Sequence, residues 1–151
     1  MKNLLYTFFI LLLTNYANAQ SINITGQWNY TIPTSAITEA GEDFSGTYES
    51  SVNQLYLNVT HNHKWAVSVK KNNIVWNDNI LIWIHRTGNG YGRGNIKGGE
   101  NYIDIPNHEV GFVTGNKEQY DVPLQLQLSG VSVTIPANNY ITEIVFTLID
   151  D

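Results

Sequence analysis

The sequence of 151 residues contains no cysteine. Without a thiol, the chain cannot form a disulfide, a zinc–cysteine site, an iron–sulfur cluster or a thiolate nucleophile. Charged residues are also scarce: they make up 14% of the chain, against a typical share of roughly 25%. This low charge excludes a coiled coil and a highly charged disordered tail, and leaves enough apolar residues for one hydrophobic core.

Basic residues and long apolar runs are few as well. Eight Lys and Arg stand against thirteen Asp and Glu, which gives a net charge of -5. No basic surface is therefore available to neutralise phosphates, and we expect no nucleic-acid partner. The longest apolar run, residues 4–13, has about half the ~20 residues that a membrane-spanning helix needs. We therefore expect no stable membrane span in the mature protein.

The apolar run has the flanks of a secretory signal peptide. Lys2 precedes it, and Ala17-Asn18-Ala19 supplies the small residues at positions -3 and -1 that signal peptidase requires. We interpret residues 1–19 as a signal peptide and residues 20–151 as the mature domain. The predicted location is the periplasm, the cell surface or the extracellular space.

The dominant period of the mature chain is two. Apolar and polar residues alternate over 55–59, 64–70 and 121–129, as in strands with one buried face. Residues 80–84 and 141–149 are apolar on both faces, which suits central strands or strands covered from both sides. Clusters of Asn and Gly separate these segments, and a helical period is absent. The sequence therefore predicts an all-β fold, an immunoglobulin-like antiparallel β-sandwich in a single domain.

The glycine-rich segment 87–99 contains no nucleotide-binding motif, because neither GxGxxG nor GxxxxGK[ST] can be placed on its glycines. We predict a long mobile hairpin tip that follows the strand at 80–86. Tyr91 and Arg93 could form an exposed contact pair on this tip, since aromatic and Arg side chains dominate interface anchors.

Metal and acid–base chemistry find little support. His61 and His63 could share a metal ion, but no third ligand adjoins them, so we interpret the segment as a turn. A glycosidase needs two carboxyl groups in one cleft. The acidic residues lie in hydrophilic segments, and we interpret them as solvated charges. We assign no catalytic residue, metal or cofactor and expect no enzymatic activity; a hydrolase is the third alternative. The acids considered are Glu39, Glu42, Asp43, Glu49, Asp104 and Glu109.

The four tryptophans are the last candidates for ligand-binding residues. Trp65 and Trp83 fall inside predicted strands and are expected to fill the core. Trp76 follows a strand and precedes Asn77-Asp78-Asn79; if exposed, its ring could stack on a sugar while amides bind the hydroxyls. A carbohydrate-binding module that uses Trp76, Tyr91 and Arg93 is therefore the alternative function, with a polysaccharide as partner, and simple packing of Trp76 stays open.

The segment Val131–Leu148 contains a proline turn, a Tyr and an alternating β-branched strand. It is similar to the last strand pair of the spore coat protein U-like and archaic chaperone–usher pilin subunits, which are small secreted bacterial sandwiches. Trp65–Val69 fits a mid-domain strand of that group. The resemblance implies an exported structural or adhesive subunit and carries over no catalytic residue.

The segment Ser21–Thr25 alternates polar and apolar residues directly after the predicted cleavage site. We expect it to be the first strand of its own sheet, although it could instead add to the open edge of a neighbouring subunit. The predicted function is that of an exported non-catalytic structural or adhesive module of the cell envelope or surface. Its expected partner is a protein or a second copy, bound through sheet edges.

Overall fold

A computed structural model describes residues 20–36, 42–44 and 46–150. The predicted signal peptide therefore lies outside the described residues, as do Glu39 and its neighbours. The elements are β1 (Ser21–Thr25), a short 3-10 helix (Thr34–Ala36), β2 (Tyr48–Glu49), β3 (Leu55–Thr60), β4 (Lys64–Val75), β5 (Leu81–Arg86), β6 (Tyr91–Gly92), β7 (Ile96–Lys97), β8 (Ile103–Asp104), β9 (Val110–Asn116), β10 (Gln119–Ser129) and β11 (Ile141–Asp150).

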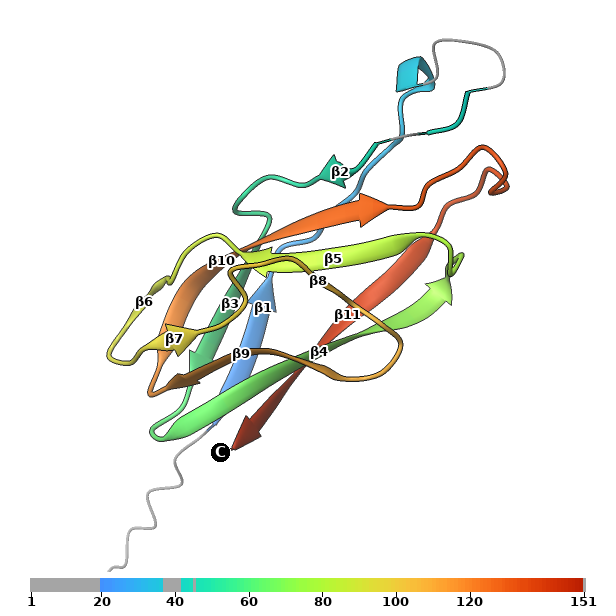
Figure 1. Cartoon of the computed structure of the whole chain (residues 1–151). Helices are drawn as coiled ribbons and strands as arrows, with labels where there is room; N and C mark the ends of the chain where they lie inside the picture. Colours follow the sequence, from blue (N-terminus) through green and yellow to red (C-terminus); the bar gives the residue numbers. More distant parts are fainter. Residues whose placement is uncertain (1–19, 37–41, 45, 151) are drawn as a thin grey trace, which may run out of the picture.

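The strands form two antiparallel sheets that pack face to face (Figure 1). Sheet A has the order β1-β3-β10-β5-β8, and both β2 and β6 also pair with β10. Sheet B has the order β11-β4-β9-β7. The predicted all-β antiparallel sandwich in a single domain is confirmed. Within the described ranges, no helix is long and apolar enough to cross a membrane.

The core lies between the sheets and is built from the alternating residues of the predicted strands. Leu57 of β3 and Leu124 of β10 are fully buried in it. Burying such a side chain stabilises the fold by about 1.5–3 kcal/mol. Trp65 of β4 is also fully buried, packs against the backbone of Gly115 and donates its indole N–H to the carbonyl of Lys117 at 2.7 Å. The prediction that Trp65 fills the core is therefore confirmed.

The prediction for the last strand needs a correction. β11 pairs with β4 and forms the edge of sheet B, whereas its apolar residues on both faces suggested a central strand. The residues from Ile144 to Leu148 are only half-buried. Residues 131–135 form no strand before it: the Ile135 N–H donates to the Ser132 carbonyl at 3.0 Å and closes a turn.

The glycine-rich segment is not a free hairpin tip. It crosses from sheet A, where β6 pairs with β10, to sheet B, where β7 pairs with β9 (Figure 1). A Cβ on Gly94 would clash with the backbone carbonyl of Asn116, so glycine is required for the close approach of these backbones. Arg86 is buried beneath the segment and binds Glu100, Asn89 and the Gly98 carbonyl.

The first strand forms within its own sheet, as expected. β1 pairs antiparallel with β3, with Ile24 opposite Leu57 and Ile22 opposite Val59. Both isoleucines are half-buried and pack against the core. β1 is the edge strand of sheet A, as β11 is of sheet B. These two edges border the same side of the sandwich (Figure 1).

Candidate functional site

A large groove opens between the sheets where β1 and β11 diverge. The two strands meet at one end, where the Gln20 side-chain amide donates to the Asp150 carboxylate at 3.2 Å. From there they spread apart toward the connection between β10 and β11 (Figure 1). The groove that results has a volume of about 1170 Å³. Ligand pockets in proteins typically have volumes of about 300–1,000 Å³, so this groove has room for a ligand or a peptide segment.

The groove is lined by apolar and neutral polar side chains. Sheet A contributes inward-facing residues of its central strands, and β11 contributes its first half. The connections at 26–32 and 131–140 form the rest of the wall. None of the described residues that line it is charged, although charged residues make up 14% of the chain. Apolar contributors include Ile24, Ile82, Leu128, Ile144 and Phe146.

The aromatic residues of the groove keep their polar atoms bound to the protein. Trp76 donates its indole N–H to the Ile80 carbonyl at 2.9 Å, and Tyr140 donates its hydroxyl to the Pro136 carbonyl at 2.6 Å. The two rings meet edge to face, with centroids 6.4 Å apart. Because these donors are satisfied, the rings offer mainly apolar surface to an occupant.

One wall of the groove is fastened by Asp43. Its carboxylate accepts the Val133 N–H at 2.7 Å and the Ser132 hydroxyl at 2.8 Å, and it also accepts the Phe44 N–H at 2.7 Å. These bonds favour the ionised form and lower the pKa of Asp43, with the bond from Val133 as the largest cause. Asp43 is exposed, as expected of a solvated charge, and in addition it ties residues 42–44 to the wall at 131–135.

The three predicted ligand-binding residues are not brought together. Trp76 is half-buried and lines the groove, directly after β4. Tyr91 and Arg93 lie at the opposite end of the sandwich, near β6 (Figure 1). Tyr91 is 63% exposed and contacts the ring of Tyr120 at 5.7 Å. Arg93 is held by Glu118 in a two-bond ion pair, which raises the pKa of Arg93 and lowers that of Glu118.

The outer face of sheet A carries a second group of aromatic and polar side chains that sequence reasoning missed. Trp83 faces outward, half-buried, and donates its indole N–H to the Ser129 hydroxyl at 2.8 Å, so its prediction as a core residue is wrong. The Tyr102 ring packs on His85 with centroids 4.1 Å apart. Burial, followed by the nearby Glu49 carboxylate, raises the pKa of Tyr102 to about 12.

The predicted solvated acids are distributed over different elements. Asp104 lies in β8 of sheet A, and one of its carboxylate oxygens is buried without a hydrogen-bond partner among the described residues. Glu109 lies over sheet B, where it accepts the Thr147 hydroxyl at 3.1 Å and pairs with Lys70 at 3.7 Å. Asp104 and Glu109 bracket a loop in the sequence, but their strongest contacts are to opposite sheets.

The predicted turn at His61 and His63 is confirmed. His61 is buried, and its Nδ1 accepts the N–H of His63 at 3.0 Å. Its Nε2 faces Asp150 at 3.3 Å without the alignment of a hydrogen bond. Among the described residues, no three His, Asp or Glu side chains gather as a metal site would require.

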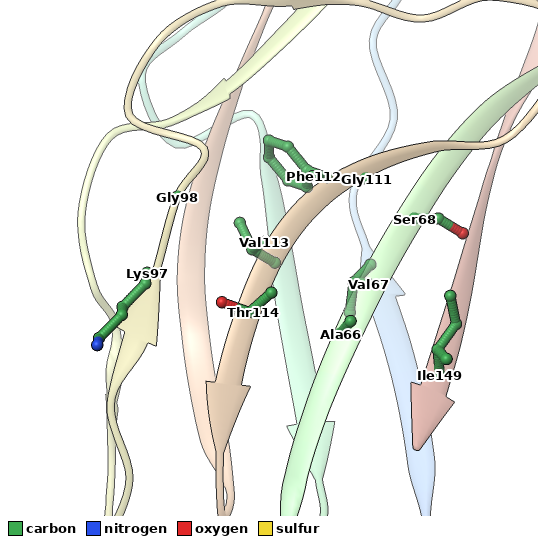
Figure 2. Close-up of a pocket in the computed structure, with 10 residues that line it drawn as sticks. All are labelled: Ala66, Val67, Ser68, Lys97, Gly98, Gly111, Phe112, Val113, Thr114 and Ile149. Carbon is green, nitrogen blue, oxygen red and sulfur yellow. The ribbon is translucent and has the colours of Figure 1, made fainter. Parts of the chain in front are cut away.

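A shallow depression of about 190 Å³ lies over sheet B (Figure 2). Lys97 and Thr114 border one side, and Ser68 and Ile149 the other. Figure 2 shows these side chains pointing in different directions rather than toward a common point. The depression therefore lacks the convergent polar groups of a binding site.

We take the groove as the candidate site because it is far larger than the depression over sheet B and its described lining is uncharged. Its described lining includes no Asp, Glu, His, Lys or Arg. The chain matched no protein-family model, no curated protein and no solved structure.

Proposed function

We propose that the protein is an exported, non-catalytic structural or adhesive module of the cell envelope or surface, which binds an extended apolar segment of another polypeptide in the groove. The observation that carries this proposal is the position, between two edge strands, of a groove whose described lining is uncharged. A partner strand there would reach both apolar walls and open backbone edges.

The physical basis is strand addition. An edge strand presents unpaired N–H and C=O groups, which pair readily with an extended chain. Alternate side chains of that chain point in one direction, so its apolar row would face residues such as Ile24 and Phe146 while its polar row stays in water. The uncharged lining favours a segment without charges, because burying an unpaired charge is costly.

Exposed residues at the rim of the groove can be substituted without disturbing the hydrophobic core, and they provide a test. Ile141 and Val133 line the groove and are 51% and 50% exposed. Ile141→Lys and Val133→Glu should therefore fold normally but place a charge where the partner strand would pack. Ile74→Lys is the matched control, since Ile74 is 56% exposed and lies outside the groove.

The probe is a synthetic peptide of residues 20–26, in which Ile22 and Ile24 alternate with polar residues. We expect this peptide to bind the mature chain, and either rim variant to weaken binding at least about tenfold, which corresponds to ~1.4 kcal/mol. A peptide with both isoleucines replaced by Asp should not bind. Full-strength binding to both rim variants would refute the groove as the site.

Mass in solution tests self-association. A chain that donates residues 21–25 to a neighbour should form oligomers, and deletion of that segment should abolish them. An unchanged oligomer after the deletion would refute strand donation. A monomer at all concentrations that also fails to bind the peptide would refute the proposed function itself.

A further inference from the structure

A row of four side chains crosses the outer face of sheet A in register. Glu49 pairs with Gln127, Gln127 with Trp83, and Trp83 with Asp104. Directly paired residues share one face of a sheet, so the four side chains form a line across β2, β10, β5 and β8. With neighbouring strands about 4.8 Å apart, the line of side chains is roughly 14 Å long. This length suits an elongated ligand made of several linked units better than one small molecule.

Tyr102 lies along this face rather than projecting from it. Tyr102 directly precedes β8 and lies beside His85 of β5. Its hydroxyl is nevertheless 3.4 Å from the Glu49 carboxylate, which lies on the far side of β5 and β10. The side chains of Tyr102 and Glu49 therefore reach toward each other over β5 and β10. This explains why Gln125, which faces outward, is buried: its side chain contacts His85 and the Ser50 carbonyl beneath that cover. Tyr102 and Trp83 therefore both contribute half-buried aromatic rings to this face.

The polar groups along the row include no cation. The Gln127 side-chain amide donates to the Glu49 carboxylate at 3.0 Å, and the carboxylates and the amide oxygen are acceptors. Glu49 and Asp104 stand at its ends, with the Gln127 amide between them. None of the described sheet A strands carries an outward Lys or Arg, and Arg86 of β5 is buried on the inner side. One carboxylate oxygen of Asp104 is buried without a donor in the described chain, which leaves its other oxygen as the acceptor available at this end of the row. The matching ligand is rich in hydroxyl donors and carries no negative charge.

We propose that this platform, formed by Glu49, Gln127, Trp83, Asp104 and Tyr102, binds a neutral oligosaccharide. The sugar rings stack on the aromatic rings, and their hydroxyls donate to the carboxylates and the amide. The platform lies on the opposite side of sheet A from the groove, whose sheet A lining consists of inward residues such as Ile82 and Leu126. The two sites are therefore separate.

Affinity electrophoresis of the mature chain through gels that contain soluble polysaccharides tests the proposal. The probes are neutral β-glucan, xylan, mannan and galactan, with anionic alginate for comparison. We expect at least one neutral polymer to retard the protein and alginate not to do so. Trp83→Ala should weaken the interaction at least tenfold, and Asp104→Asn, which keeps the shape of the side chain, at least threefold.

Matched controls separate this platform from the other aromatic residues. Tyr91→Ala removes an exposed ring at the far end of the sandwich, and Ile141→Lys alters the groove; both should leave the retardation unchanged. If Trp83→Ala fails to fold, Asp104→Asn and Tyr102→Ala, checked by thermal unfolding, provide the same test. No retardation by any neutral polymer, equal retardation by alginate, or full binding by folded platform variants would each overturn the proposal.

Discussion

The hydroxyl of Tyr102 lies 3.4 Å from Oε1 of Glu49, across two intervening strands of sheet A. This contact determines how Tyr102 responds to alkaline pH. Burial and the negative charge of Glu49 both disfavour the phenolate and raise the pKa of Tyr102 from its ordinary value of 10.0 to about 12.

The raised pKa predicts a loss of stability at high pH. Below pH 10, Tyr102 is neutral in both the folded and the unfolded chain, so its contribution is complete. Between pH 10 and about 12 only the unfolded chain ionises there, and the contribution falls. Carbon-13 NMR of the tyrosine rings should show a late titration of Tyr102, beside that of Tyr48, whose pKa burial also raises. Glu49→Gln should bring the Tyr102 titration closer to pH 10, and an unchanged titration in that variant would contradict the role of Glu49.

The lowered pKa of Asp43 leads to a prediction about the hydrogen bonds of this residue at acid pH. Because its pKa lies below 3.8, the hydrogen bonds to Val133 and Phe44 are complete above that pH and are lost as the pH falls through the lowered pKa. The amide resonances of Val133 and Phe44 should therefore shift together during an acid titration. In Asp43→Asn those shifts should disappear, while the amides of β9 serve as a reference that does not move.

Core packing gives a prediction about stability. Leu57→Ala should lower the free energy of unfolding by about 2–5 kcal/mol, because the fully buried side chain leaves a cavity between the sheets. Val52→Ala is the control: Val52 is 56% exposed, and the change should stay within about 0.5 kcal/mol. Urea denaturation measures both. Equal effects would contradict the position of the core.

Two glycines, one in the glycine-rich segment and one in β9, provide a matched pair of substitutions. Gly94→Ala should destabilise the fold by at least about 2 kcal/mol, since the new Cβ meets the backbone of Asn116, which has little freedom to move. Gly111→Ala meets nothing within 4 Å and should be neutral or stabilising by about 0.4–1 kcal/mol. Thermal unfolding distinguishes the two. A harmless Gly94→Ala would show that the segment is as mobile as the sequence suggested.

The residues that the sequence predicted well are those whose role depends on local pattern. Alternation at 55–59 and 121–129 identified β3, β10 and the core positions Leu57 and Leu124, because period two reports directly which face is buried. The pattern could not orient Trp83, since both faces of its strand are apolar. The structure places Ile82 inward and Trp83 outward.

The candidate sites were less accessible to sequence reasoning because they depend on contacts between distant residues. Trp76 was identified as a candidate, but its partner Tyr140 is 64 positions away and becomes a neighbour through the pairing of β4 with β11. The Glu49–Asp104 row depends on three registers at once. Nothing local distinguishes Gly94 as a close-contact glycine from a flexible one.

The meeting of Gln20 with Asp150 has a practical consequence for both proposals. The groove begins beyond this contact, at Ile24 and Phe146, and widens away from it. A tag or a biotin attached ahead of Gln20 would therefore hold the domain on a sensor chip by its closed end. The groove mouth and the outer face of sheet A would then both stay accessible to analytes in the flow.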